Sequence, residues 1–550
     1  MLLLALWPSV ASATTVETAI HTRIDQLAEH RALTIGSTRI AASRLLPELY
    51  ERRGDRPAWE PVARLDSLID AIADAEFDGL APKDYALDEL RRRRAEVSGG
   101  HADPAARADL DLLATDALAR LAYHLYLGKV DPAQLDPHWN FPRRFDREDA
   151  VAVLGRALDT GHVSLLLERA RPEQPLYHAM RRLLIAHLEL ARRGGWPKVP
   201  GGSMLEPGAV DARVPALRAR LAASGDLEGS RFGAARSVAA DSSRVFDPAL
   251  ARAVEAFQRR HLLAADGAVG PATLAALNVP IERRIEQLRV NLERGRWVLQ
   301  HLPDSFVVTN VAAYETYLVV GNRRVWTARC QVGQQSRQTP IFRADMRTVV
   351  FNPTWTVPSG ILARDILPSL KRGDLSVLRR KRLDVLDAKG RVVSPESVNW
   401  SHVSARNCPY TLRQDAGPDN ALGRVKLLFP NPYAVYLHDT PARDLFEHTQ
   451  RAFSSGCIRV ERPLELAERA LADSRWDAEA IAKTVESGKT TSVALRHPLP
   501  VLLLYWTAFP ISGPGGVAFA ADIYRRDARV LHGLEAKVRS TAAASTAKAP

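Results

Sequence analysis

Cysteine is scarce in this sequence: three of the 550 residues are cysteines, namely Cys330, Cys408 and Cys457. So few cysteines exclude a disulfide framework as the main source of stability for a chain of this length. A single Cys330–Cys408 bridge stays open as an alternative, because the sequence does not give the separation of the two thiols. Long hydrophobic runs are also missing. The apolar run at 501–506 is much too short to span a bilayer and predicts a buried strand.

Acidic residues are outnumbered by basic ones, 63 to 75, which gives a formal net charge of +12. Such a charge suits any polyanionic partner. The basic residues fall in scattered clusters, at 91–94 and 379–382, without the interleaved aromatic residues of a nucleic-acid surface. We therefore expect no nucleic-acid partner and attribute the charge to attraction to an anionic cell envelope.

The composition, 46% hydrophobic and 25% charged, is that of a globular protein, and the length predicts about three domains. Residues 2–7 are apolar, and Ala11-Ser12-Ala13 follows them as a small-residue cleavage site. No Lys or Arg precedes this run. We expect residues 1–13 to be a signal peptide or a short membrane anchor. We therefore expect the protein to be exported to the periplasm.

Cys457 and His438 carry the predicted chemistry. His438 ends the strand-like run 433–437, and Cys457 lies in a turn after Ser454-Ser455-Gly456, shortly before a helix that begins near Pro463. A thiolate is the reactive form of cysteine, and a protonated His438, Arg459 and the helix start would each lower the thiol pKa. Gly456 would let the backbone N–H groups of residues 456 and 457 face an oxyanion. The competing interpretation is a buried structural thiol.

These residues resemble the catalytic domain of the L,D-transpeptidases (YkuD-like), whose pattern is a strand-end histidine followed by S-x-G-C-x-R. The resemblance implies that Cys457 is the acylated nucleophile, that His438 is its base and that Arg459 is the arginine of the motif. Many members have a second histidine two residues before the cysteine. This chain has Ser455 there, and the large periplasmic branch of the family also has a serine. The alternation of an extended strand turns Asp439 away from His438, so a backbone carbonyl or Ser455 is left to orient the imidazole.

The fold class predicted is multidomain α+β: a helical N-terminal scaffold, a small three-helix-type domain and a mainly β catalytic domain with an inserted lid. The predicted boundaries are 14–235 for the scaffold, 236–280 for the small domain, 281–302 for a connecting amphipathic helix, 303–535 for the catalytic domain, 359–423 for its insertion and 536–550 for a disordered tail.

The small domain is identified by a second resemblance. Residues 246–250, 254–258 and 266–278 are similar to the peptidoglycan-binding domain of bacterial wall enzymes. Leu250, Phe257 and Leu274 supply its predicted core. The alternative is that this unit serves only as a spacer, because the sequence offers no ligand residue for a glycan.

The insertion 359–423 leaves the sheet after Trp355 and returns just before the strand that carries His438. We expect it to cap a bound substrate, with Trp355 and Tyr436 near the pocket and Arg413 and Gln414 available to polar groups of a peptide. The alternative is a solvated loop that only decorates the sheet.

The function implied by the resemblance is L,D-transpeptidation in cell-wall remodelling. Cys457 would be acylated by a tetrapeptide stem of peptidoglycan, and a second stem amine would take the acyl group (3-3 cross-linking), without metal or organic cofactor. Carbapenems would acylate the same thiol, and envelope or wall-synthesis proteins are candidate partners. The alternatives are an L,D-carboxypeptidase, attachment of an envelope protein through the same acyl-enzyme, or a non-catalytic peptidoglycan-binding scaffold. If His438 is not the base, His448 is the next candidate.

Overall fold

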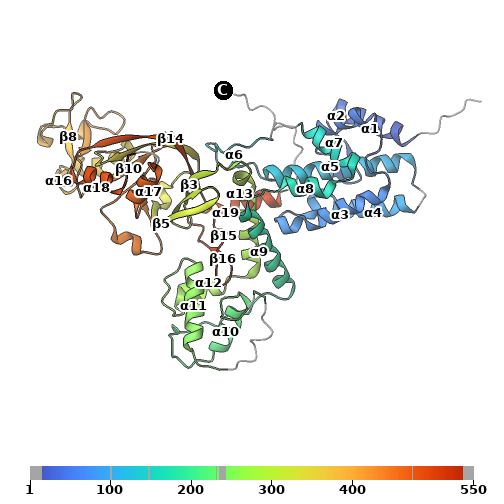
Figure 1. Ribbon diagram of the computed structural model, residues 1–550, viewed down its shortest axis with the longest axis horizontal. Helices are drawn as coiled ribbons and strands as arrows, with labels where there is room; N and C mark the ends of the chain where they lie inside the picture. Colours follow the sequence, from blue (N-terminus) through green and yellow to red (C-terminus); the bar gives the residue numbers. More distant parts are fainter. Residues whose placement is uncertain are drawn as a thin grey trace, which may run out of the picture.

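The computed structural model describes residues 15–99, 102–145, 149–230, 232–233, 243–472 and 475–536. Three bodies meet near the middle of the molecule: a helical body, a small cluster of helices and a β-rich body (Figure 1). The predicted signal segment 1–13 and all but the first residue of the predicted tail 536–550 lie outside the described residues. Among the residues that are described, no helix has both the length and the apolar character required to cross a membrane.

The helical body is built around one long central helix, α5 (Pro104–Leu127). Asp103 caps its first turn through Ala106 N–H, and Pro104 occupies the first helical position. α5 is apolar on most sides, so other helices pack around it. These helices are α1 (Val16–His30), α2 (Leu45–Arg53), α3 (Leu65–Ala73), α4 (Leu87–Ser98), α7 (Ala150–Thr160) and α8 (Val163–Ala170). The short α6 (Pro132–Leu135) then leads toward the β-rich body.

The small cluster contains three helices: α10 (Val214–Ala223), α11 (Pro248–Arg260) and α12 (Pro271–Leu277). Leu217 and Leu221 of α10 share one buried core with Phe257 of α11. α10 precedes residue 236, in the segment that sequence patterning assigned to the scaffold. Its even distribution of apolar residues gives no marked stripe, which is why periodicity alone did not separate it from the helices before it.

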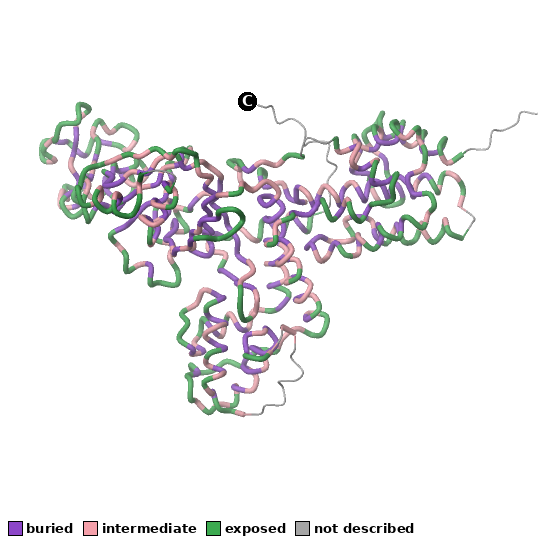
Figure 2. Tube along the Cα trace, in the orientation of Figure 1, coloured by how far each residue is buried: buried purple, intermediate pink, exposed green. Residues whose placement is uncertain are grey.

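The three bodies are joined by α13 (Ile281–Val298), which packs against α9 (Pro175–Arg192) and the C-terminal α19 (Asp527–Glu535). An amphipathic helix was predicted here. In the structure the residues from Val290 to Val298 are all buried, because neighbours cover the helix on every side (Figure 2). The buried polar side chains are paired: Glu293 with Arg296 at 2.5 Å, and Arg294 with Asp527 at 2.6 Å.

The β-rich body is a closed sheet. Its strand order is β5-β13-β11-β10-β6-β14-β3-β4, and β4 pairs back with β5. The β-rich runs at 306–311, 317–320 and 325–332, which are broken by Gly321-Asn322 and Gly333, predict an antiparallel meander, and the structure confirms it. The strands are β3 (Ser305–Asn310), β4 (Glu315–Val320), β5 (Arg323–Gly333), β6 (Arg343–Phe351), β10 (Val425–Leu428), β11 (Leu437–His438), β13 (Ile458–Val460) and β14 (Thr491–Leu504).

Short elements complete the β-rich body. The strand β12 (Ala452–Ser454) adds to β5 beside the barrel, and two helices, α17 (Pro463–Ala470) and α18 (Ala478–Glu486), follow β13. β15 (Ala508–Pro510) and β16 (Val517–Phe519) pair as an antiparallel hairpin. The turn that contains Cys457 joins β12 to β13.

The inserted segment has a core of its own. A three-stranded sheet, in the order β7-β9-β8, packs with three short helices around buried residues such as Leu362, Ile366 and Leu412. The elements are β7 (Trp355–Thr356), α14 (Ser359–Ile361), α15 (Leu367–Lys371), α16 (Ser376–Arg380), β8 (Asp384–Leu386) and β9 (Thr411–Gln414). A separate apolar core is not a feature of a solvated loop, so the segment is folded, and its capping role stays a prediction.

Candidate active site

The turn from Ser454 to Cys457 is closed by the side chain of Ser454. Its Oγ accepts a hydrogen bond from Gly456 N–H at 3.1 Å and donates to the Cys457 carbonyl at 2.6 Å. Gly456 has φ +120°, a conformation that residues with a Cβ rarely adopt. The bond to Ser454 corrects one expectation, since the Gly456 N–H is already used and cannot also face an oxyanion. The Cys457 N–H is the backbone donor that this turn leaves beside the thiol.

A second loop, residues 333–339, holds this turn in place. Gln334 N–H donates to the Ser454 carbonyl at 3.0 Å, and the Thr339 hydroxyl donates to the Gly456 carbonyl at 2.9 Å. Thr339 N–H in turn donates to the hydroxyl of Tyr524 at 3.1 Å. The turn is therefore fixed by its neighbours before any substrate arrives. Sequence patterning did not find this loop, because its residues match no motif and lie more than 100 positions away.

Four polar residues form a row across neighbouring strands. His438 on β11 lies opposite Lys426 on β10 and opposite Arg459 on β13, and Arg459 lies opposite Gln331 on β5. Arg459 also donates to the Gln331 side chain at 3.1 Å. Directly paired residues share one face of a sheet, so all four side chains project to the same side.

The period of two along a strand adds Tyr436 and Cys457 to this face, because they lie two residues before His438 and Arg459. The rings of Tyr436 and His438 are 5.6 Å apart, and both the backbone and the side chain of Tyr436 act on the Cys457 thiol to lower its pKa. The Lys426 ammonium lies 4.3 Å from the centre of the Tyr436 ring. The structure thus brings Cys457, His438, Arg459 and Tyr436 together.

The imidazole of His438 is oriented by a backbone carbonyl. Its Nδ1 lies 2.5 Å from the Asp439 carbonyl oxygen, which fixes Nδ1 as the protonated nitrogen. Of the two orienting groups left open by the sequence, the carbonyl is the one observed. The Asp439 carboxylate is used elsewhere: it accepts from Arg424 N–H at 2.9 Å and pairs with Arg443 at 3.0 Å. Nε2 of His438 is thereby left with its lone pair available to accept a proton.

Burial first, and then the positive charge of Arg459, lower the pKa of His438 to about 3. Burial also raises the pKa of the Cys457 thiol, although Tyr436, Lys426 and Arg459 each oppose that effect. The resting pair near pH 7 is accordingly a neutral imidazole and a neutral thiol. This corrects the expectation that a protonated His438 lowers the thiol pKa, because a second charge beside Arg459 and Lys426 is unfavourable in a buried site.

Three family models match the chain. Residues 304–493 match the L,D-transpeptidase catalytic domain (YkuD), residues 211–277 the "Putative peptidoglycan binding domain", and residues 44–184 a scaffold domain. Residues 304–493 form an L,D-transpeptidase catalytic domain. His438, Cys457 and the whole inserted segment lie within it, and α10 lies within the match to the small domain.

Among known proteins, a "Putative L,D-transpeptidase" of Haemophilus influenzae is 35% identical over 247 residues, covering 44% of this chain. The chain spans about half of the length of that relative, 49%. An L,D-transpeptidase structure from Mycobacterium smegmatis shares 12% identity over 36% of this chain and 58% of its own, with a TM-score of 0.18. A fused Zn-dependent amidase/peptidase/peptidoglycan-binding domain-containing protein from Clostridium acetobutylicum shares 13% identity over 55% of this chain and 100% of its own, with a TM-score of 0.15. Both TM-scores are too low to support an argument about the fold.

Three of the residues predicted to bind substrate interact with other residues of the inserted segment of the catalytic domain. Trp355 is buried in the core of that segment. Both ends of the Gln414 amide are engaged: its nitrogen donates to the Asp419 carbonyl, and its oxygen accepts from Ala421 N–H at 2.8 Å. Arg413 pairs with its neighbour Asp415 at 3.0 Å. The order of strands predicted that the two ends of the insertion lie near the active site. It could not predict the direction in which each side chain points.

The other cysteines and His448 lie apart from this site. Cys330 is buried in β5, where burial raises its thiol pKa to about 12, and it is a free thiol, as is Cys408. The suggested Cys330–Cys408 bridge is therefore absent from the described residues. His448 is exposed and packs edge-on against Phe453 at 5.6 Å. In the portion of the chain with described side chains, no three His, Cys, Asp or Glu residues are grouped so that they could hold a metal ion.

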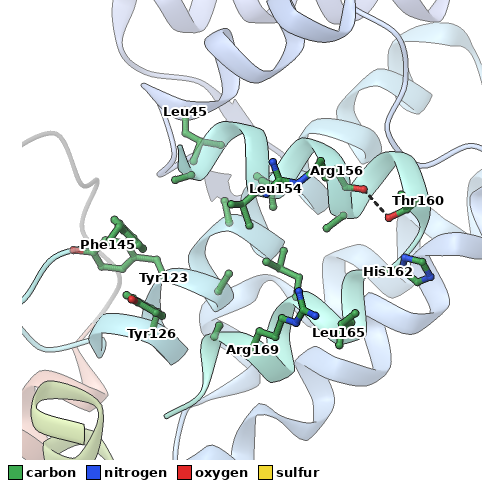
Figure 3. A pocket seen from close by; sticks show the side chains of 17 residues that line it. Leu45, Tyr123, Tyr126, Phe145, Leu154, Arg156, Thr160, His162, Leu165 and Arg169 are labelled. Atoms are coloured by element: carbon green, nitrogen blue, oxygen red, sulfur yellow. Dashed lines mark hydrogen bonds between the residues drawn. The ribbon is translucent and has the colours of Figure 1, made fainter. Parts of the chain in front are cut away.

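A large apolar hollow lies in the scaffold, remote from the catalytic domain in sequence. It has a volume of about 640 Å³ and opens between α5, α7 and α8, where Tyr123, Tyr126 and Phe145 line one end (Figure 3). Arg156 and Arg169 lie along its wall. Its lining residues include no cysteine, so the size of a cavity does not by itself locate the chemistry of this protein.

Proposed function

We propose that this protein is a cysteine-dependent L,D-transpeptidase that remodels peptidoglycan by 3-3 cross-linking. The observation that carries the proposal is the placement of His438 and Cys457 on one face of neighbouring strands, with the imidazole tautomer set by the Asp439 carbonyl. Acyl transfer requires a nucleophile, a base that accepts its proton and a donor for the oxyanion. The Cys457 thiol, the neutral imidazole and a backbone N–H can supply these three roles.

In the first half-reaction, Cys457 Sγ attacks the carbonyl of the diaminoacyl residue in a donor tetrapeptide stem. Nε2 of His438 takes the thiol proton, and the Cys457 N–H stabilises the oxyanion. The terminal D-amino acid leaves as an amine after it receives the proton from His438, and a thioester remains. In the second half-reaction, the side-chain amine of another stem attacks the thioester, His438 accepts its proton, and the free thiol is restored.

The charged row beside the thiol supports this chemistry. Lys426 and Arg459 lower the thiol pKa against the effect of burial, so they favour the negative charge that develops on sulfur during attack. Burial lowers the pKa of both Lys426 and Arg459. Their role in the proposal is electrostatic, whereas proton transfer belongs to His438.

We also propose that the inserted segment caps the donor stem. Tyr436 packs against the core of the barrel and against the separate core of the insertion, so it stands at the junction between the two. Tyr436 also acts on the Cys457 thiol. A single side chain therefore connects the core of the insertion with the reacting sulfur. A stem held between the two cores would be screened from water and aligned for transfer.

Two alternatives share the same acyl-enzyme. Water in place of the second stem gives an L,D-carboxypeptidase, and an amine of an envelope protein gives attachment of that protein to the wall. A non-catalytic scaffold that binds peptidoglycan through the 211–277 domain is the rival from another class. The half-buried Cys457 thiol and the set tautomer of His438 favour an enzyme over that rival.

Peptidoglycan is the proposed partner of both the catalytic and the small domain, and this implies an extracytoplasmic, periplasmic location. No nucleic-acid partner is proposed. A carbapenem should acylate Cys457, because its strained carbonyl mimics the donor carbonyl. Attachment of an adduct to any residue other than Cys457 in intact-protein and peptide mass spectra would count against the assignment.

The decisive experiment incubates the purified protein with tetrapeptide muropeptides and follows the masses of the products. We expect dimers that have lost one terminal amino acid per cross-link, and no product from Cys457→Ala. Tripeptides without dimers would identify a carboxypeptidase. Unchanged masses with retained binding to wall sacculi would identify the non-catalytic scaffold and overturn the proposal.

A further inference from the structure

Arg337 bridges the inserted segment and the turn of the nucleophile. Its Nη1 donates to the Ser455 hydroxyl at 2.9 Å and to Asp365 Oδ2 at 2.7 Å, and its Nη2 donates to Asp365 Oδ1 at 2.5 Å. Asp365 belongs to a π-helical turn of the insertion, Leu362–Ile366, and Ser455 lies two residues before Cys457. One guanidinium therefore contacts two segments that are about 90 residues apart in sequence.

The loop that carries Arg337 is rigidly attached to the nucleophile turn. Successive residues of the turn are held by three groups of the 333–339 loop: Gln334 N–H holds Ser454, Arg337 holds Ser455, and Thr339 holds the Gly456 carbonyl. The backbone is also tightly packed at its base, since a Cβ on Gly333 would lie 2.1 Å from the Arg337 carbonyl oxygen. A displacement of Arg337 should therefore also displace the turn, because three hydrogen bonds join the 333–339 loop to it.

The Arg337–Asp365 pair differs from an ordinary surface ion pair. The side chains of Arg337 and Asp365 are only 14% and 32% exposed, and the pairing is bidentate. The pairing raises the pKa of Arg337 and lowers that of Asp365. Exposed pairs contribute little to stability, but a fork-shaped guanidinium against a carboxylate in a half-buried position fixes the geometry of both partners.

We propose that Arg337 is a positioning residue that couples the inserted segment to the nucleophile turn, so that the segment and Cys457 keep one fixed relative placement while the donor stem is bound. This inference rests on the proposed function for its consequence in catalysis. The coupling itself is a property of the free protein and can be measured without substrate.

The first test uses amide hydrogen exchange of the free protein. Asp365→Ala should speed exchange in the peptide that covers residues 452–457 by about fivefold or more, although Asp365 touches none of these residues. The matched control is Asp374→Ala, which removes another aspartate of the insertion that pairs with Arg380 at 3.3 Å. This control should leave residues 452–457 unchanged. Faster exchange confined to residues around 359–371 in Asp365→Ala would overturn the coupling.

The second test is a double-mutant cycle on transfer between muropeptides. Asp365→Ala and Ser455→Ala should each lower kcat by about tenfold with a smaller change in KM, and the double variant should be no slower than the worse single one. In an Arg337→Ala background, Asp365→Ala should have no further effect. Arg337→Lys should recover only part of the rate, because one ammonium cannot make the forked contact. Additive effects would overturn the bridge.

The two tests separate failure of the inference from failure of the proposed function. If the parent protein makes no cross-links, the proposed function fails, yet the exchange experiment still decides whether Arg337 couples the two segments. If the parent protein is active and Asp365→Ala changes neither exchange at 452–457 nor kcat, the function stands and the positioning role is wrong.

Discussion

His438 and Arg459 lie directly opposite each other on the neighbouring parallel strands β11 and β13. The guanidinium of Arg459 is one reason that the buried imidazole stays neutral, and burial is the larger reason. A buried, neutral histidine with one ring nitrogen already bonded to a carbonyl is prepared to accept a proton and not to hold a resting ion pair.

Arg459→Gln should raise the pKa of His438 by about one unit, because a positive charge on the same face is removed. NMR titration of the His438 imidazole measures this directly. The control is Arg462→Gln, since Arg462 pairs with Glu465 at 2.9 Å and no contact joins it to His438. An unchanged titration in Arg459→Gln would show that burial alone keeps the imidazole neutral.

His438→Ala should slow acylation of Cys457 by roughly 10²–10⁴-fold through loss of the base. The thiol pKa should change little, because the neutral imidazole contributes no charge to it. Both quantities follow from the rate of thiol alkylation and of carbapenem acylation as a function of pH. A thiol pKa that rises by a full unit or more in the variant would instead show that His438 is charged in the resting enzyme.

Gly456→Ala should lower stability by about 1–3 kcal/mol and slow acylation, because alanine resists a φ of +120°. Space is not the obstacle, since the nearest atom to an added Cβ is the Gln338 carbonyl oxygen at 3.8 Å. Gly373→Ala is the control: Gly373 also has positive φ, +82°, and no neighbour within 4 Å. If both variants unfold at the same urea concentration and only Gly456→Ala is inactive, the conformation of the turn itself is what acylation requires.

Stability should fall as the pH drops from about 6.5 toward 3. His187 and His438 are buried with pKa values lowered to about 3, whereas in the unfolded chain they titrate near 6.5. The unfolded state therefore binds more protons throughout this window, and each such histidine costs up to about 1.4 kcal/mol per pH unit. Urea unfolding between pH 7 and 4 checks the direction. His187→Gln should flatten the dependence, and a slope that is unchanged in this variant would exclude its contribution.

Replacing residues 355–422 with a short Gly/Ser linker should leave alkylation of Cys457 by a small reagent intact and impair transfer between muropeptides. The replacement removes the whole inserted sheet. A short linker can close the gap because Phe351 and Val425, near its two ends, are directly paired in the barrel. Thermal unfolding verifies that the barrel remains folded. Transfer at the parental rate would show that the segment does not cap the donor.

Local patterns in the sequence determined much of this protein. The run Ser454 to Arg459 and the strand-end His438 carry the resemblance to the L,D-transpeptidase catalytic domain, and the match of residues 304–493 to that domain confirms it. Strand patterning likewise predicted the β3–β4–β5 meander, and helical periodicity predicted the helical scaffold. In each of these, the signal is a contact between residues close in sequence, which local periodicity records.

Only the tertiary structure decided the rest. The neutral state of His438 and the link from Asp365 through Arg337 to Ser455 depend on segments far apart in the chain. The bond from Gly456 N–H to Ser454 and the bonds of the Gln414 amide join residues close in sequence, but hydrophobic periodicity does not record side-chain hydrogen bonds. Hydrogen-bond direction and burial are set by which strands become neighbours, and one sequence without its fold carries no record of that. The residue types that perform the chemistry were thus determined locally, whereas their charges, partners and orientation were determined by long-range packing.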